Sequence, residues 1–161
     1  MDPITEFAFN LNNGLLTYAS LIINNDLIFL LIITALVLLI EKRDGKRAKI
    51  FSAIILSAVF VVLIKSFMMA ERPCVSLGLE YCPESYSFPS MHATIAFTMM
   101  ISFINKKSYW IFMIFALFVA FTRMVLAVHS FIDIAGALPV ALITYYIIDV
   151  VGRSLYGKNR A

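Results

Sequence analysis

The chain has 161 residues, of which 61% are hydrophobic and only 14% are charged, and its formal net charge is +3. Its mean hydropathy of +0.91 is far higher than a water-soluble domain of this length needs. This composition excludes an ordinary soluble enzyme. It indicates an integral membrane protein with one compact domain, and we expect no nucleic-acid partner.

The first apolar segment is interrupted by polar residues. The stretch FAFNLNNGLLTYASLIINND contains five asparagines and a glycine, which favours a helix that lies in the membrane interface or re-enters the membrane over one that crosses it. The sequence therefore predicts five crossings if this segment stays at the interface, and six if it spans.

Five longer apolar runs follow, and we expect each to be helical because a helix satisfies its own backbone hydrogen bonds in lipid. They cover residues 27–40, 50–70, 90–104, 109–128 and 131–151. Several contain only about 14 or 15 uninterrupted apolar residues, fewer than the roughly 20 that cross a bilayer core, so their polar ends must extend them.

The predicted fold class is therefore all-α: a polytopic transmembrane helix bundle of five spans, or six, in a single membrane-embedded domain over residues 1–161. Within it we expect an interfacial or re-entrant helix at 1–25, the bundle at 26–151 and a cytoplasmic tail at 152–161.

The distribution of lysine and arginine predicts the orientation. Loop 41–49 holds five of them, loop 105–108 holds two and the tail holds three. Five alternating crossings place all three segments on one side, which the positive-inside rule makes cytoplasmic. The other basic residues, Lys65, Arg72 and Arg123, fall on the opposite side, where that rule would not place them.

Three polar motifs lie on this outer side. They are KSFMMAERP at 65–73, PSMH at 89–92 and TRMVLAVHSFID at 122–133, and they contain both histidines of the chain, His92 and His129. A lone basic residue at a span end is most often a snorkelling anchor. Ionisable groups at membrane depth are costly, however, so their coincidence on one leaflet indicates a functional site.

The spacing within the motifs favours an anion site. Lys65 and Arg72 are seven residues apart, so a second helix continuing through both would place the two cations on one face. Ser90 is a predicted N-cap of the third helix, whose first amides attract anions. Arg123 adds a guanidinium, which suits the bidentate geometry of phosphate oxygens.

His129 and Asp133 form a second spacing signal. They are four residues apart, so at the start of a helix the carboxylate can accept the imidazole N–H and fix its tautomer. The other ring nitrogen of His129 then remains available as a nucleophile.

In order and spacing these motifs resemble the type 2 phosphatidic acid phosphatase family, which is related to vanadium haloperoxidases and bacterial acid phosphatases. The family signature reads K-x6-R-P, P-S-G-H and S-R-x5-H-x3-D. This chain departs from it at Met91, where glycine is usual, and at Thr122, where serine is usual. Met91 adds bulk beside the phosphate site.

The resemblance implies a role for each motif residue. His129, oriented by Asp133, attacks phosphorus to form a phosphohistidine, and His92 protonates the leaving oxygen and later activates water. The phosphate-binding residues implied by the motifs are Lys65, Arg72, Ser90, Met91 and Arg123.

Two other classes of function compete with this interpretation. His92, His129 and Asp133 could ligate a metal, but three nearby cations would repel a divalent ion, so we expect no metal and no cofactor. A non-catalytic phospholipid-binding or transport protein would keep the anion site without turnover. The presence of both histidines and the aspartate favours the enzyme.

The substrate class follows from the membrane setting. A phosphate site at the hydrocarbon boundary suits a phosphorylated lipid, with water as the second substrate. Compact size and an outward-facing site resemble the polyprenyl (undecaprenyl) diphosphate phosphatases of the plasma membrane, while phosphatidic acid and phosphatidylglycerol phosphate are rival substrates. Cys74 and Cys82 lie in the outer loop, where a disulfide between them is permitted.

Overall fold

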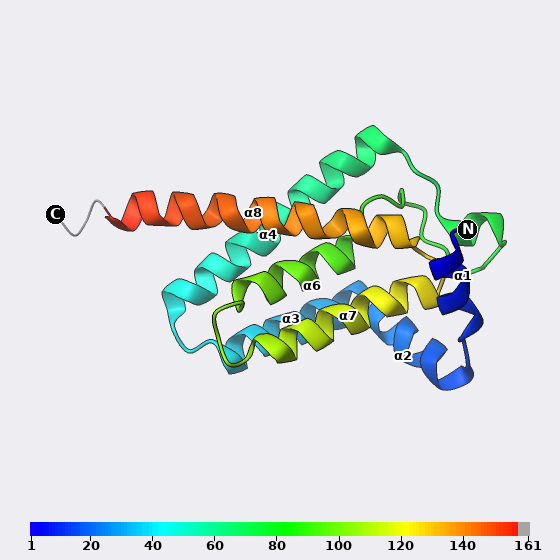
Figure 1. The fold of residues 1–161 in the computed structure, drawn as a ribbon, viewed down its shortest axis with the longest axis horizontal. Helices are drawn as coiled ribbons and strands as arrows, with labels where there is room; N and C mark the ends of the chain where they lie inside the picture. Colours follow the sequence, from blue (N-terminus) through cyan, green and yellow to red (C-terminus); the bar gives the residue numbers. More distant parts are fainter. Residues whose placement is uncertain (158–161) are drawn as a thin grey trace.

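The structure, a computed structural model that describes residues 1–157, contains eight α-helices and no β-strand within that range (Figure 1). The helices are α1 (Pro3–Asn10), α2 (Gly14–Asn24), α3 (Asp26–Ile40), α4 (Asp44–Met68), α5 (Pro73–Ser76), α6 (Met91–Ser102), α7 (Tyr109–Val125) and α8 (Phe131–Gly157). The all-α fold class is confirmed.

The five predicted apolar runs correspond to α3, α4, α6, α7 and α8. Helix α4 begins at Asp44, inside the basic loop, rather than at residue 50. An acid in the first turn complements the helix dipole, and the lysines and arginines that follow are good helix formers. Helix α8 likewise continues to Gly157, so the predicted tail 152–161 is helical up to there, and residues 158–161 lie outside the described residues.

Three of these helices end earlier than predicted, and the first of them is α6, which ends at Ser102 rather than at residue 104. Helix α4 ends at Met68, because Met69 adopts a left-handed conformation with φ of 46°. Helix α7 ends at Val125, and Ala127 turns the chain with φ of 51°. The expectation that Lys65 and Arg72 share one helix face is therefore wrong: Arg72 lies in a loop, just before α5.

The N-terminal segment forms two short helices, and α2 meets α3 at an angle of 79°, as in a broken span or a re-entrant loop. Within residues 1–157, α4 and α8 are each long and apolar enough to cross a membrane, and the bent α2–α3 pair is a third candidate. Helices α6 and α7 are apolar but shorter, at 12 and 17 residues. Length and composition thus support two or three of the predicted crossings directly.

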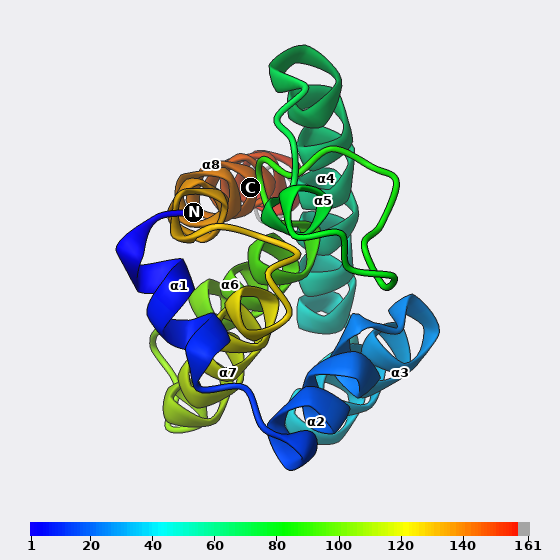
Figure 2. The same cartoon turned by 90° about the vertical axis from the view of Figure 1, so that its right-hand side faces the viewer.

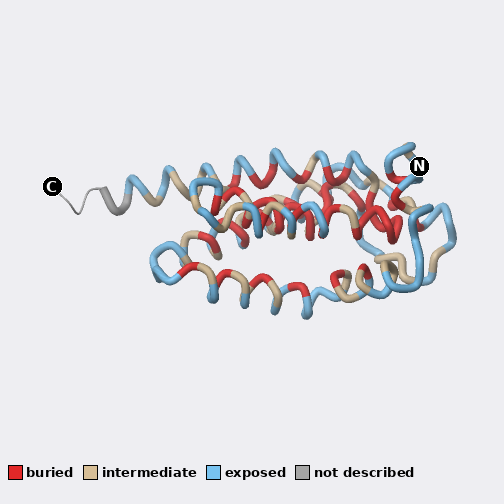
Figure 3. Tube along the Cα trace, turned by 60° about the horizontal axis from the view of Figure 1, so that its bottom comes forward, coloured by how far each residue is buried: buried red, intermediate tan, exposed pale blue. Residues whose placement is uncertain are grey.

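Helix α6 lies at the centre of the bundle and packs against α4, α7 and α8. Its small residues Ala93 and Ala96 are fully buried, which allows the helices to approach closely. Buried positions face inward while the outer faces stay exposed (Figure 3). Large apolar side chains such as Leu31, Ile55 and Ile143 cover these outer faces, as expected for a surface in contact with lipid.

A buried polar contact joins three helices at mid-bundle. The Ser57 hydroxyl of α4 lies 2.9 Å from that of Thr98 in α6 and 2.6 Å from that of Thr144 in α8. All three residues have no exposed surface. Because an unpaired hydroxyl is costly away from water, this triad favours one arrangement of the three helices.

The two ends of the bundle differ in charge. At one end lie the α3–α4 turn, the α6–α7 loop and the last turns of α8 (Figure 1), joined by ion pairs from Glu41 to Lys106 and from Lys49 to Asp149. These segments carry the basic clusters of the sequence. The opposite end, seen face on in Figure 2, carries α1, α5 and the long loop between α4 and α6.

Candidate active site

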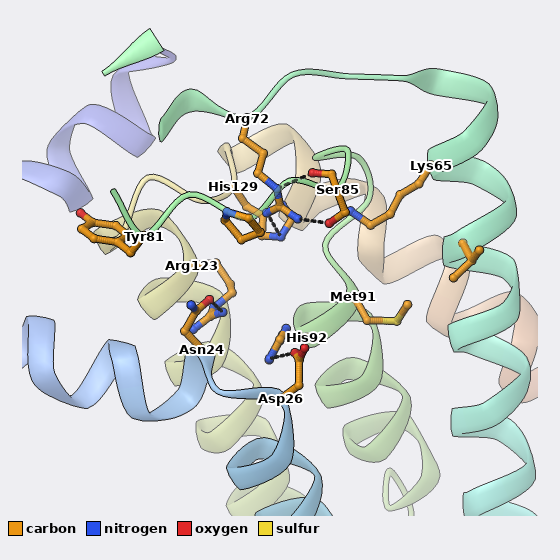
Figure 4. Close-up of a pocket in the computed structure, with 12 residues that line it drawn as sticks. Asn24, Asp26, Lys65, Arg72, Tyr81, Ser85, Met91, His92, Arg123 and His129 are labelled. Atoms are coloured by element: carbon orange, nitrogen blue, oxygen red, sulfur yellow. Dashed lines mark hydrogen bonds and ion pairs between the residues drawn. The ribbon is translucent and has the colours of Figure 1, made fainter. Parts of the chain in front are cut away.

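A cavity of about 510 Å³ opens at the end of the bundle that carries α5 (Figure 4). Helices and loops from across the chain contribute to it. Its lining residues are Asn24, Asp26, Val62, Lys65, Arg72, Tyr81, Pro83, Ser85, Met91, His92, Arg123 and His129. Six residues predicted from the motifs are thus brought to one cavity, whereas Ser90 and Asp133 are buried and do not line it.

Lys65 reaches the cavity from the last turn of α4 and is 8% exposed. Its ammonium group donates hydrogen bonds to the carbonyl oxygens of Tyr86 and Ser87, the latter at 3.0 Å. These bonds tie the end of α4 to the loop that precedes α6. The loop is also held by Phe88, whose ring lies where any side chain at Gly136 of α8 would overlap it.

Arg72 is the most extensively bonded of the cations. Its Nε donates to the Ser85 carbonyl at 2.7 Å, and one terminal nitrogen donates to the Ser85 hydroxyl at 2.9 Å. The other terminal nitrogen donates to the Val128 carbonyl at 2.7 Å and lies 3.0 Å from Nε2 of His129. Burial lowers the pKa of Arg72 to about 10, so the guanidinium is charged at neutral pH.

The bond from Arg72 defines the tautomer of His129. A guanidinium only donates, so Nε2 of His129 accepts with its lone pair and Nδ1 carries the proton. Nδ1 faces Oδ2 of Asp133 at 3.5 Å. Burial, together with the nearby Arg72 and Lys65 cations, lowers the pKa of His129 to about 3, although its bond with Asp133 acts in the opposite direction. The imidazole is therefore neutral and presents a lone pair at Nε2.

Asp133 is buried in the first turn of α8 and is held by short hydrogen bonds. Its Oδ2 accepts from the Ser87 hydroxyl at 2.5 Å and from the Ser130 backbone N–H at 2.6 Å. The Ser87 hydroxyl also lies 3.4 Å from Nδ1 of His129. The carboxylate is therefore fixed in position beside the imidazole.

Arg123, in the last turn of α7, is 1% exposed. It is held by the N-terminal segment: its guanidinium donates to Oδ1 of Asn24 at 2.9 Å and to the Ser20 carbonyl at 3.2 Å. Helix α2 therefore positions the third cation.

The start of α6 supplies His92 and Met91. Nε2 of His92 lies 3.5 Å from Oδ1 of Asp26, within ion-pair range but without hydrogen-bond geometry. Met91 lines the cavity. Ser90 occupies the predicted N-cap position, but its side chain makes no capping hydrogen bond, and its hydroxyl is buried without a partner.

A disulfide joins Cys74 and Cys82. It closes the loop that carries Tyr81, and Pro83 and Ser85 of the cavity follow directly after it. The pairing restrains the segment that supplies two of the hydrogen bonds to Arg72.

Sequence reasoning missed four residues that build the site. Ser85 and Ser87 hold Arg72 and Asp133, while Asn24 and Asp26 line the cavity from the α2–α3 bend. The one available signal for the last two was the polar break NND in an otherwise apolar segment. Serines in a loop carry no spacing signal at all.

The cavity combines three cations and two imidazoles, with the Asp133 carboxylate behind His129 and the Asp26 carboxylate beside His92. Such a set suits a phosphate group, because guanidinium and ammonium groups neutralise its oxygens while a neutral imidazole can act as nucleophile. Within residues 1–157, no three side chains of histidine, cysteine, aspartate or glutamate gather as a metal site.

Comparison with known proteins gives one family and two similar structures. The model of the PAP2 superfamily matches residues 48–153. The crystal structure of LpxE from Aquifex aeolicus aligns with a TM-score of 0.64 and 23% identity, over 90% of this chain and 92% of that one.

The second structure is a transmembrane PAP2-type phosphatidylglycerolphosphate phosphatase from Bacillus subtilis. It aligns with a TM-score of 0.65 and 18% identity, over 94% of this chain and 83% of that one. Among curated proteins, none matches the sequence significantly. At these identities the two structures establish a shared fold.

Proposed function

Since the chain belongs to the PAP2 superfamily, we propose that it is an integral membrane lipid phosphatase that acts through a phosphohistidine. One observation supports this most strongly. His129 presents a neutral Nε2 beside the Arg72 guanidinium, and its Nδ1 faces the buried carboxylate of Asp133. In this tautomer the imidazole can act as a nucleophile once phosphate oxygens accept the Arg72 N–H in place of Nε2.

In the first step Nε2 of His129 attacks phosphorus, the N–P bond forms and the bond from phosphorus to the leaving oxygen breaks. His92 donates a proton to that oxygen. Asp133 stabilises the positive charge that the His129 ring acquires, because its carboxylate faces the Nδ1–H. Lys65, Arg72 and Arg123 neutralise the non-bridging oxygens.

In the second step His92 takes a proton from water, the water oxygen attacks phosphorus and the N–P bond breaks. Phosphate is released and His129 regains its neutral form. We place the phosphate near the start of α6, where Met91 faces the cavity, while the backbone N–H of Ser90 donates to the Asp133 carbonyl oxygen at 3.2 Å. The helix start favours a bound anion.

We infer that turnover needs neither a metal nor another cofactor. Lys65, Arg72 and Arg123 meet at the cavity, and their charges supply the stabilisation that a divalent ion gives in other phosphatases while repelling such an ion. Activity that persists in EDTA is the expected result.

The proposed substrate is a phosphorylated lipid. The first candidate is polyprenyl (undecaprenyl) diphosphate, which would be cleaved to the monophosphate. The cavity lies at the end of a bundle whose outer faces are apolar, so a lipid tail can remain in the bilayer while its headgroup enters. Phosphatidylglycerol phosphate is the second candidate, because one of the similar structures is a phosphatidylglycerolphosphate phosphatase from Bacillus subtilis. Phosphatidic acid is the third.

We place the protein in the plasma membrane as one multi-pass domain, with the site on the extracytoplasmic face. The basic segments 41–49 and 105–108 lie at the end of the bundle opposite the cavity, and the positive-inside rule assigns that end to the cytoplasm. The disulfide at the cavity end agrees with this orientation, because disulfides persist outside the cytoplasm.

The test is phosphate release by purified protein in EDTA from undecaprenyl diphosphate, phosphatidic acid and phosphatidylglycerol phosphate. We expect His129→Ala to abolish release and Lys65→Gln to reduce it, while Lys46→Gln leaves it unchanged. Lys46 is a matched control because it is an exposed lysine of α4 at the opposite end.

The competing function is lipid binding or transport without turnover. It predicts no phosphate release from any of the three lipids, together with lipid binding that survives His129→Ala. That pair of results would replace the phosphatase proposal.

A further inference from the structure

Asp26 is the one acidic side chain among the described residues that line the cavity. It stands in the first turn of α3, directly after the α2–α3 bend. A carboxylate there repels a phosphate group. Unless it contributes to the reaction in another way, Asp26 therefore weakens binding at a site otherwise built from cations.

Helix α3 contacts the imidazole of His92 at two points. Oδ1 of Asp26 lies 3.5 Å from its Nε2, and the ring of Phe29 lies 4.3 Å from the imidazole, centroid to centroid, tilted by 40°. Asp26 and Phe29 are three residues apart, so both side chains project from one face of α3. Figure 4 shows the Asp26 and His92 side chains directed toward each other.

The edge of the His92 ring that faces Asp26 is otherwise unpaired. Nε2 is buried and has no hydrogen-bond partner, although a buried ring nitrogen normally finds one. The Asp26 carboxylate is the acceptor within reach. Catalytic hydrogen bonds are often long in an enzyme without substrate and tighten when substrate binds.

We propose that Asp26 is a positioning residue for His92: with Phe29 it clamps the imidazole, accepts its Nε2–H and leaves Nδ1 to exchange the proton with the substrate. This inference rests on the proposed phosphatase function. As in the pair of His129 and Asp133, a carboxylate oxygen lies 3.5 Å from a ring nitrogen, but the Asp26 side chain is 95% exposed and that of Asp133 only 6%.

Apart from Asp26, the charged side chains that line the cavity with His92 are cations. Around His92 these cations come from Arg123 of α7, Arg72 of the loop before α5 and Lys65 of α4, while the neutral His129 comes from the loop before α8. Asp26 is the anion that faces His92 from α3. Its negative charge favours the imidazolium that must donate to the leaving oxygen.

The experiment compares kcat/KM across pH for the wild type and the Asp26→Asn and Asp26→Glu variants, with two kinds of substrate. One is phosphatidic acid or phosphatidylglycerol phosphate, whichever the wild type hydrolyses faster, since each releases an alcohol that needs a proton. The other is a nitrophenyl phosphate with an alkyl tail, whose leaving group needs none. Asp44→Asn is the matched control, because Asp44 is a first-turn acid at the opposite end.

We expect Asp26→Asn to lower kcat/KM for the lipid about 10- to 100-fold and to move the basic limb of its pH profile about one unit toward lower pH. Hydrolysis of the nitrophenyl ester should change less than about threefold, since no proton donor is needed. Asp26→Glu should recover most of the lipid activity, and Asp44→Asn should match the wild type.

Equal losses with both substrates, or an unmoved basic limb, would show a merely structural role for Asp26 and overturn the inference. Unchanged lipid hydrolysis by Asp26→Asn would overturn it as well. Those results leave the proposed function standing as long as His129→Ala is inactive. A wild type that releases no phosphate, or an active His129→Ala variant, would instead refute the proposed function and this inference with it.

Discussion

Replacing Arg72 by lysine keeps the positive charge and removes the geometry of the guanidinium. Arg72 donates two bonds to Ser85, at 2.7 and 2.9 Å, and a third to the Val128 carbonyl at 2.7 Å. A lysine ammonium placed beside Val128 cannot also reach Ser85, because its donors radiate from one nitrogen. Two hydrogen bonds of a charged group are therefore lost.

Each such bond contributes about 1.5–3 kcal/mol, so the loss is about 3–6 kcal/mol. At about 1.4 kcal/mol for each factor of ten, kcat/KM should fall about 100- to 10,000-fold. This change in kcat/KM is measured from initial rates of phosphate release from lipid in detergent micelles. The thermal unfolding midpoint is recorded for each variant. Arg153→Lys is the control, since Arg153 is 81% exposed at the other end of the bundle.

A kcat/KM for Arg72→Lys within about threefold of the wild type would refute the reasoning, because the charge alone would then suffice. An unfolding midpoint that falls while activity per folded molecule is unchanged would also count against it. In that case the bonds from Arg72 would stabilise the loop without positioning the reacting groups.

Three further predictions concern packing, pH and phosphate binding. Ser57→Ala removes the hydroxyl that joins α4 to α6 and α8 and should destabilise the protein by about 0.6–1.7 kcal/mol, seen as a lower unfolding midpoint; an unchanged midpoint contradicts this. Burial lowers the pKa of His129 from 6.5 to about 3, so stability should be full above about pH 6.5 and decline as the pH falls toward 3. His129→Gln should flatten that dependence, and identical pH profiles would count against a buried neutral imidazole. Asn24→Ala removes a bond of 2.9 Å to Arg123 and should raise KM about tenfold with little change in kcat; an unaltered KM would show that α2 does not position this cation.

Several features were predictable because they depend on composition and local spacing. Hydropathy identified the five apolar runs that became α3, α4, α6, α7 and α8. The three motifs, read together with the family that they resemble, identified six of the residues that line the cavity, among them Lys65, Arg123 and His129. The spacing of His129 and Asp133 needed only one helical turn, and the structure places the two side chains 3.5 Å apart.

Helix ends were less predictable, and they changed the site. Met69 and Ala127 adopt left-handed conformations that a hydrophobic pattern does not reveal. Because α4 stops at Met68, Arg72 reaches the cavity from a loop instead of lying along the helix face of Lys65. Ser90 shows the same limit, since its position before α6 was predicted and the burial of its unpaired hydroxyl was not.

The sequence by itself determined that this is a helical membrane protein with its cations and histidines gathered in three motifs, because solvent preference and helical spacing are local properties of the chain. Only the tertiary structure decided that the N-terminal bend supplies Asn24 to Arg123 and Asp26 to His92. Those partners are separated by many tens of residues along the chain. Which of them meet depends on how the helices pack, and no local pattern encodes that.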